Sequence, residues 1–408
     1  MTIKRESFAF VIVMIIMVIA IQNLFAAENL FDAIKNGKTS GFMKTWYQTD
    51  NNARNDKGIF NKENSIFDAG LMLGYSTDTF HGFGAGFTFY AVDDMGMNEV
   101  LACHCIHNIE AKEAGTWLGE SYLSYQIRGT TAKLGRQKIA SPLVNSDNWA
   151  VVPNFFEAVM LNSTDIPATT LTAAFVTEER WLKGKEFEAF AGDGILMLGA
   201  INKSLPNSSI SAWFYNAKKN FYGKDTRAVY LEAGTKISMI GVAAQYMLFS
   251  SDADVAENTT AFGTKVSLQK GIFELTGAYT SVSDGSFNAA KFSDHGIKTP
   301  IYSFTISGDG DIAGGKDTDS YKISAVASLI DGLKVTANYG LYDHGSNFAP
   351  SPDSKSTSIE LIATYTGFKD ITLFATYVLS DHNGVGAWSG ADADDKLSSI
   401  RIWTQYSF

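Results

Sequence analysis

The chain ends in Arg401-Ile402-Trp403-Thr404-Gln405-Tyr406-Ser407-Phe408. In an extended strand, Ile402, Tyr406 and Phe408 share one face, while Arg401 and Gln405 share the other. Soluble domains usually end in polar residues that fray into water, so an aromatic final strand is unusual there. A closing strand of a soluble β-sandwich is one alternative. The other is a transmembrane β-barrel, which needs such a strand to close its sheet and to present aromatic side chains to lipid.

The N-terminal segment predicts export from the cytoplasm. Lys4 and Arg5 precede an apolar run over residues 8–21, and small residues follow that run, which is the layout of a cleavable signal peptide. We therefore expect residues 1–27 to be removed and residues 28–408 to form the mature protein, with an uncleaved signal anchor as the alternative. Elsewhere the sequence has no apolar stretch long enough for a transmembrane helix. A membrane-spanning form would then have to use strands.

Composition narrows the class of protein and of partner. Charged residues make up 19% of the chain, below the roughly 25% of average soluble proteins. The formal net charge of -10 would repel phosphates, so we expect no nucleic-acid partner. The sequence has no linker or composition break that would divide it into two domains.

Apolar and polar residues alternate in many segments. In residues 67–75, 321–329, 333–341, 359–365 and 371–377, apolar residues alternate with small polar or charged ones. One apolar face and one polar face are expected when lipid lies outside a sheet and water lies inside it. About eighteen such segments begin near residues 40, 66, 81, 117, 130, 154, 168, 195, 208, 226, 239, 260, 271, 320, 332, 357, 370 and 396.

The connectors between these segments alternate between long and short along nearly the whole chain. Bacterial outer-membrane barrels have this asymmetry, with tight periplasmic turns and longer extracellular loops. An even number of strands also returns the C-terminus to the periplasmic side. The sequence therefore predicts an all-β fold, a transmembrane antiparallel β-barrel of about eighteen strands in the bacterial outer membrane.

One stretch resembles a known family. The run from Leu134-Gly135-Arg136-Gln137, through Asn145-Ser146-Asp147, to Phe156-Glu157-Ala158-Val159 resembles the segment after strand five of OprD family outer-membrane porins. The opening residues 28–35 are similar to the lead-in of the major outer-membrane porins of epsilonproteobacteria. The resemblance implies a passive channel of eighteen strands that is narrowed by an inward-folded loop at residues 138–153. The OprD relatives imply a monomer and the major porins imply a homotrimer.

The family's substrate class does not carry over to this chain. Glu157 stands where relatives often place a basic residue, so part of their basic ladder is missing. We expect a porin that lets ions and small hydrophilic solutes diffuse, with a mild preference for cations or partial substrate selectivity, because an acidic lumen concentrates cations. A surface adhesin or receptor is the alternative. We expect no enzyme, since neither G-x-S-x-G nor H-E-x-x-H occurs, although a barrel hydrolase is a third class.

Strand parity selects candidate pore residues. Charged residues that alternate with the apolar face should point into the lumen, where they are tolerated. Arg128 and Lys133 are expected beside the constriction loop and are the candidates for guiding ions. Asp147 is the acidic candidate on the loop, with a turn role as its alternative. The full predicted set is Glu120, Arg128, Lys133, Arg136, Asp147, Glu157, Lys265, Lys322 and Arg401, with Lys334, Glu274 and Glu360 also facing the lumen.

Two loops carry weaker signals for metals. Cys103, His104, Cys105 and His107 offer four ligands for Zn or Cu, but this spacing is a weak metal signature, and a disulfide or an inert loop is the simpler alternative. The acidic, glycine-rich residues 308–317 offer oxygen ligands for Ca, with a flexible acidic loop as the alternative. We expect no required cofactor.

The aromatic C-terminus implies two further partners. Tyr406 and Phe408 would face the lipid of the outer membrane. In barrels of this kind a terminal aromatic residue resembles the signal that the barrel-insertion machinery reads, so this pair is the candidate insertion signal.

Overall fold

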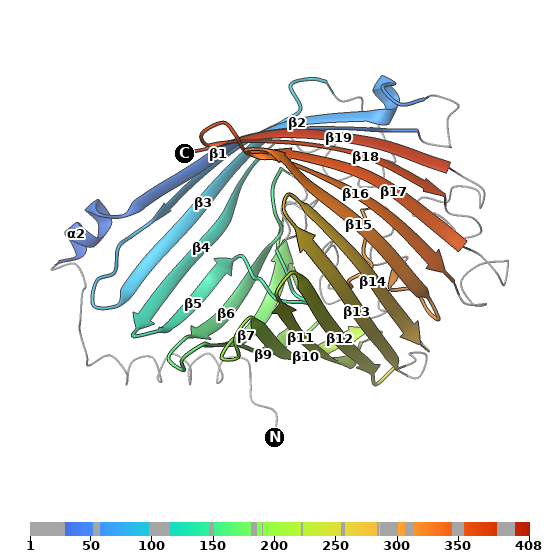
Figure 1. The fold of residues 1–408 in the computed structure, drawn as a ribbon. Helices are drawn as coiled ribbons and strands as arrows, with labels where there is room; N and C mark the ends of the chain where they lie inside the picture. Colours follow the sequence, from blue (N-terminus) through green and yellow to red (C-terminus); the bar gives the residue numbers. More distant parts are fainter. Residues whose placement is uncertain are drawn as a thin grey trace.

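The computed structural model describes residues 29–51, 58–97, 115–146, 151–180, 186–189, 191–221, 223–253, 258–283, 285, 301–306, 313–344, 355–381 and 396–408. Strands dominate this part of the chain and form one antiparallel sheet (Figure 1). Within the described ranges, no helix is long and apolar enough to cross a membrane.

The elements follow one another along the chain with few helices. A short helix, α2 (Leu30–Lys35), precedes the sheet, and one 3-10 turn, η1 (Lys62–Asn64), precedes the second strand. The strands are β1 (Lys38–Asp50), β2 (Ser65–Ser76), β3 (Phe83–Asp93), β4 (Gly115–Ile127), β5 (Thr130–Gln137), β6 (Phe155–Ser163), β7 (Thr169–Arg180), β8 (Glu188–Ala189), β9 (Ile195–Asn202), β10 (Ser208–Phe221), β11 (Lys224–Ile237), β12 (Ile240–Ser251), β13 (Thr259–Lys270), β14 (Phe273–Ser283), β15 (Asp319–Ile330), β16 (Leu333–Asp343), β17 (Lys355–Tyr365), β18 (Ile371–Asp381) and β19 (Lys396–Ser407).

The sheet closes into a barrel of eighteen strands. Apart from β8, each strand pairs with its neighbours in sequence, and β1 pairs with β19, with Trp46 opposite Trp403. At this seam Gly41 and Phe408 exchange both backbone hydrogen bonds, at 2.8 and 2.9 Å. Among the described residues, β8 pairs only with the end of β7, and β7 also pairs with β9, so β8 adds no position to the ring. The predicted all-β barrel is confirmed, and the eighteen strands begin within two residues of their predicted starts.

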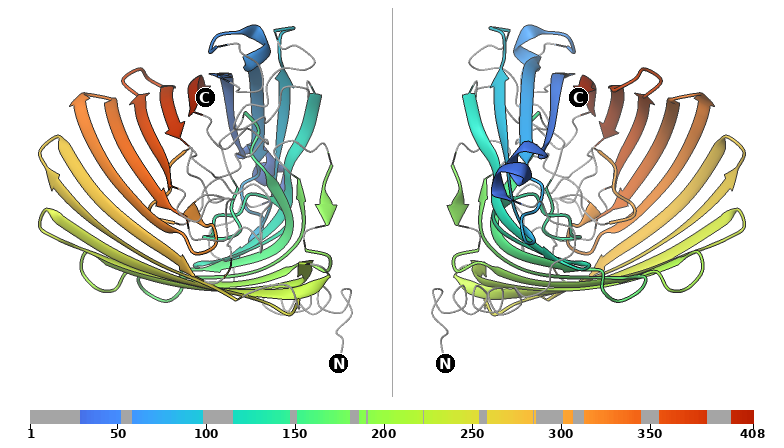
Figure 2. Two further views of the ribbon diagram at one scale, coloured as in Figure 1. Left: turned by 90° about the vertical axis from the view of Figure 1, so that its right-hand side faces the viewer. Right: turned by 90° about the vertical axis from the view of Figure 1, so that its left-hand side faces the viewer.

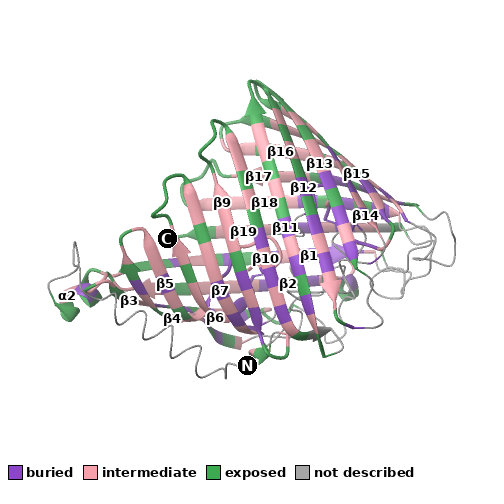
Figure 3. Cartoon of the chain, turned by 90° about the horizontal axis from the view of Figure 1, so that it is seen from below, coloured by how far each residue is buried: buried purple, intermediate pink, exposed green. Residues whose placement is uncertain are grey.

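Burial alternates along the strands as lipid outside and a filled lumen inside require. Phe262 and Val266 on β13 and Leu275 on β14 are exposed on the outer face, whereas Ala261 and Val282 are buried inside. Residues that lie opposite one another in an antiparallel sheet share a face. Buried and exposed residues therefore form bands that run across neighbouring strands, as Figure 3 shows.

The two ends of the barrel differ. At one end lie α2, the start of β1, the end of β19 and the short turns, such as the two-residue turns after β4 and β13. At the other end most connectors are long, although only residues 222–223 separate β10 from β11. Figure 2 shows that described segments from the long-connector end lie inside the curve of the strands.

Candidate channel constriction

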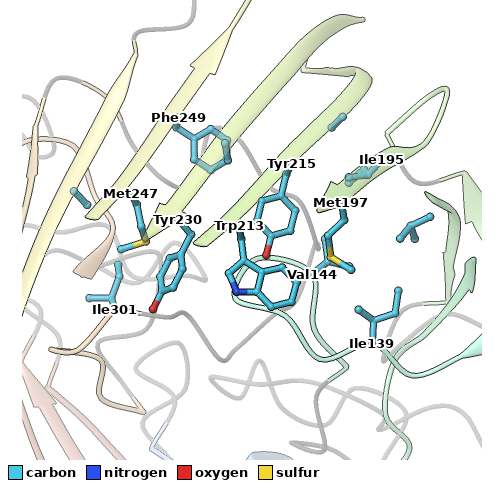
Figure 4. Packing of buried hydrophobic residues seen from close by; sticks show 14 of the residues in the cluster. Ile139, Val144, Ile195, Met197, Trp213, Tyr215, Tyr230, Met247, Phe249 and Ile301 are labelled. Atoms are coloured by element: carbon cyan, nitrogen blue, oxygen red, sulfur yellow. The ribbon is translucent and has the colours of Figure 1, made fainter. Parts of the chain in front are cut away.

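Residues 138–146 fold into the barrel against its inner wall. Ile139 and Val144 are buried in a cluster with Met197 of β9 and with Trp213 and Tyr215 of β10 (Figure 4). The backbone N–H of Leu143 donates to the Tyr215 hydroxyl at 3.3 Å. The first half of the predicted constriction loop is therefore fixed to β9 and β10 by apolar burial and one hydrogen bond.

The second half of the same loop contacts a different part of the wall. Val151 and Val152 are buried in a cluster with Trp46 of β1 and Tyr90 of β3. Gly70 of β2 leaves the space that Val151 fills, because a Cβ on Gly70 would collide with Val151. Residues 138–146 and 151–152 thus connect the β9–β10 wall with the β1–β3 wall across the lumen.

A second segment, residues 301–306, also lies inside the barrel. The Tyr302 hydroxyl donates to Glu232 of β11 at 2.7 Å, and the Tyr230 hydroxyl donates to the other carboxylate oxygen at 2.9 Å. The Lys265 ammonium of β13 lies 4.2 Å from the centre of the Tyr302 ring, a cation–π contact. Burial and the neighbouring Glu232 carboxylate raise the pKa of Tyr302, so its hydroxyl stays a neutral donor.

The other side of this segment is held by β15 and β17. The Lys322 ammonium donates to the carbonyl oxygen of Phe304 at 2.8 Å. Glu360, which is almost fully buried, accepts the backbone N–H of Ile306 and the Asn338 side-chain amide, the latter at 2.9 Å. The sequence analysis did not predict that residues 301–306 lie inside the barrel.

The structure separates the two basic residues that were predicted to guide ions. Lys133 points into the lumen, with its ammonium 4.2 Å from the centre of the Tyr122 ring. Arg128, by contrast, lies in the turn after β4 with a φ of 52°, at the opposite end of β5 from residues 138–153. The expected position of Arg128 beside the constriction loop is therefore wrong, because the turn ends the alternation one residue earlier.

Arg128 instead belongs to a hydrogen-bonded turn at the short-turn end. Asp165 accepts the Thr130 hydroxyl at 2.6 Å and the backbone N–H of Gly129 at 2.8 Å. The Thr130 hydroxyl, then the Gly129 N–H and more weakly the Arg128 charge lower the pKa of Asp165. This ionised carboxylate stabilises the tight β4–β5 connection.

Two residues of the family-like motif pair with each other. Arg136 Nε donates to Glu157 Oε1 at 2.8 Å across the β5–β6 pair, and its guanidinium lies 4.2 Å from the centre of the Phe187 ring. Glu157, where relatives often have a basic residue, is thus the direct partner of the motif arginine. The pair gives no net charge to its part of the wall.

Glu120 and Arg401 face the lumen as parity predicts. A Glu120 carboxylate oxygen lies 3.9 Å from the Lys138 ammonium at the start of the inward loop. Arg401 donates from Nε and Nη2 to the Gln48 side-chain oxygen at 3.1 and 3.0 Å, and its guanidinium lies 4.8 Å from the centre of the Trp46 ring.

The sequence analysis missed Lys44 at the same seam. Its ammonium lies 5.0 Å from the ring centres of both Trp46 and Trp403. Alternation along β1 would have found it, since Lys44 shares a face with Trp46 and Gln48. The seam between β19 and β1 therefore holds two buried cations beside indole rings on the inner face of the wall.

Several predicted residues cannot be placed. Asp147 and the Cys103–His107 cluster lie outside the described residues, as does much of the acidic 308–317 segment. Within the described ranges, no three His, Cys, Asp or Glu side chains are grouped as a metal site would require. Tyr406 and Phe408 are both exposed on the outside, with ring centres 5.9 Å apart.

A cavity of about 650 Å³ opens on the inner wall of β10 to β13. Its lining includes Glu232 and Lys265, the two side chains that also contact Tyr302, together with Ser211 and Ser267. Water-sized solutes can thus occupy the lumen beside residues 301–306.

A closed eighteen-strand barrel with an apolar outside, a polar lumen and inward-folded segments defines a channel of the Gram-negative outer membrane. The chain belongs to the Gram-negative porin family, whose family model matches residues 24–384. Because this family consists of non-enzymatic channels, the predictions of an outer-membrane porin for small solutes and of no enzyme are confirmed. No curated protein sequence matches the chain.

Solved structures agree on the fold. The chain is similar to OccAB1 of Acinetobacter baumannii, with a TM-score of 0.76 and 16% identity over 92% of this chain and 97% of that one. It is also similar to OccK3 (OpdO) of Pseudomonas aeruginosa, with a TM-score of 0.73 and 16% identity over 93% and 98% of the two chains. The predicted likeness to OprD family channels is thus confirmed for the fold. The likeness to epsilonproteobacterial porins stays a prediction.

Proposed function

We propose that small hydrophilic solutes and ions diffuse through this barrel past a constriction built from residues 138–146, 151–153 and 301–306, with a mild preference for cations. The observation that carries the proposal is the anchoring of both segments to the inner wall. A barrel of sixteen to eighteen strands otherwise leaves a wide aqueous channel, so segments that cross it set the bore.

Charge supports the cation preference. The chain carries a formal net charge of -10, and an acidic channel concentrates cations around it. The ammonium groups of Lys133 and Lys265 lie over tyrosine rings, and that of Lys322 is bound to a backbone carbonyl. These cations are therefore less available to bind a passing anion.

Planar bilayers test both parts of this proposal. Purified protein should give discrete conductance steps, and a salt gradient should give a reversal potential on the cation-selective side. Absence of conductance steps would contradict the channel and favour a surface receptor. A reversal potential of the opposite sign would contradict the cation preference alone.

We make two further proposals about the mature protein. We propose that residues 1–27 are removed on export, which agrees with a family match that begins at residue 24. Mass spectrometry of the purified N-terminus tests this. The homotrimer, with a monomer as its alternative, stays a prediction that light scattering of the purified protein distinguishes.

A further inference from the structure

The helix α2 has an apolar face that the barrel does not cover. Leu30, Phe31 and Ile34 are 60%, 72% and 49% exposed, whereas Ala33 is 1% exposed. At roughly 100° per residue, the three exposed apolar side chains occupy an arc of about 100°, Lys35 lies beside one edge of this arc, and Asp32 lies on the opposite side of the helix. An isolated helix of this length is not stable in water, so something must hold it.

Contacts with the barrel hold one side of α2 in place. The Tyr75 hydroxyl donates to the backbone carbonyl of Ile34, and the backbone N–H of Asp78 donates to the carbonyl of Ala33 at 2.9 Å. The helix is also capped, since the Asn29 side chain accepts the N–H of Asp32 at 2.9 Å. These bonds fix the position of the helix without covering its apolar face.

The contact with Tyr75 places α2 on the outer side of the wall. Tyr75 lies opposite Phe87 in the β2–β3 pair, with ring centres 5.9 Å apart, and Phe87 is exposed on the apolar exterior. Gly37 passes so close to the Tyr75 ring that a Cβ would collide with it. Figures 1 and 3 show α2 at the short-turn end, projecting beyond the ends of the strands.

We infer that α2 is a lipid-binding anchor that lies in the interface of the membrane leaflet at the short-turn end. Its apolar face is continuous with the exterior that the barrel already presents to lipid, through Tyr75 and Phe87 to Leu73. Interfacial helices bury such a face roughly 5–10 Å into the boundary between headgroups and acyl chains and keep charged residues in water. Asp32 and Lys35 lie outside the apolar arc of α2, where their charges can stay in water.

Lipid is a better occupant than a second copy of the chain. The patch is small and stands at the rim of a surface that is apolar because lipid surrounds it, and no further partner is needed to explain it. The anchor fixes the start of β1 at the interface and with it the height of the barrel seam in the membrane.

Spin labels at single cysteines test the inference in the full-length barrel. In a background with Cys103→Ser and Cys105→Ser, Leu30→Cys would be labelled and compared with Asp32→Cys, which lies about 160° away around the helix, in phosphatidylethanolamine–phosphatidylglycerol vesicles. We expect the label at position 30 to collide mainly with dissolved oxygen, which partitions into lipid, and the label at position 32 mainly with a water-soluble nickel chelate. Ile34→Cys, one turn from Leu30 on the same face, repeats the comparison with Asp32→Cys.

Two outcomes would overturn the anchor. Equal access of the nickel chelate to positions 30, 32 and 34 would place the whole helix in water. Spin–spin broadening at position 30 that disappears on dilution with unlabelled protein would assign the face to a second copy. A channel that conducts normally in either case would leave the porin function intact.

Discussion

Glu360 offers a sharp test of how residues 301–306 are held in the lumen. The Glu360→Ala variant removes the carboxylate that accepts the Ile306 N–H and the Asn338 amide. A hydrogen bond to a charged group contributes roughly 1.5–3 kcal/mol, so the docked segment loses about 2 kcal/mol from the bond to Ile306 alone. Since 1.4 kcal/mol is a factor of ten, the ratio of docked to undocked segment should fall about 30-fold.

Single-channel recordings would measure the result. An undocked segment leaves more of the lumen open, so we expect a higher mean conductance and transitions between two levels. Glu274→Ala is the matched control, because Glu274 also faces the lumen but its bond from the Thr276 hydroxyl, at 3.4 Å, stays within β14. It changes the charge equally and should leave the bore unchanged.

Lys322→Met separates steric from electrostatic effects. It removes the bond to the Phe304 carbonyl and so should raise conductance as Glu360→Ala does, although the two variants change the charge in opposite directions. Their reversal potentials should therefore shift in opposite directions. The anchoring role is refuted if Glu360→Ala behaves like Glu274→Ala, or if conductance follows the charge in all three variants.

Three more predictions concern residues of the barrel wall. Lys133→Ala should shift the permeability ratio toward cations, with a smaller shift for Arg128→Ala in its turn; an unchanged reversal potential for Lys133→Ala would reject its role. Ile323→Arg, on the outer face, should lower the free energy of unfolding in bilayers by roughly 2–4 kcal/mol, whereas Ser324→Arg should cost much less, and equal losses would contradict the assignment of faces. Deletion of Phe408 should reduce the amount of inserted barrel before it alters conductance; normal insertion would leave it only a closing role.

The barrel could be predicted because its side chains alternate regularly between lipid and lumen. Lipid on one side of a strand and water on the other impose a period of two on every segment. Even the short β5 and the strands β9 and β10 begin at the predicted residues 130, 195 and 208. The same alternation assigned Lys265, Lys322 and Arg401 to the inner face of the wall, where their contacts lie.

Features that do not follow the two-residue alternation of the strands were missed or misplaced. Residues 301–306 have no alternation, and their place depends on contacts with strands far away in the sequence, such as Glu232 and Glu360. Arg128 was misplaced because a left-handed turn residue does not continue the pattern of its strand. Register also matters, since the Arg136–Glu157 pair follows from the alignment of β5 with β6 and not from either segment alone.

The hydrogen bonds between Gly41 and Phe408 have a consequence for the order of folding. They join β1 to the end of β19, so the ring cannot be completed before all the strands between them and β19 itself have been made. Closing so long a loop is entropically slow, and until it happens β1 and β19 both present unpaired backbone groups. Newly exported chains therefore pass through a stage with two unpaired edge strands that can pair with other chains. Protection of these edge strands, more than formation of the strands themselves, should decide the yield of folded barrel.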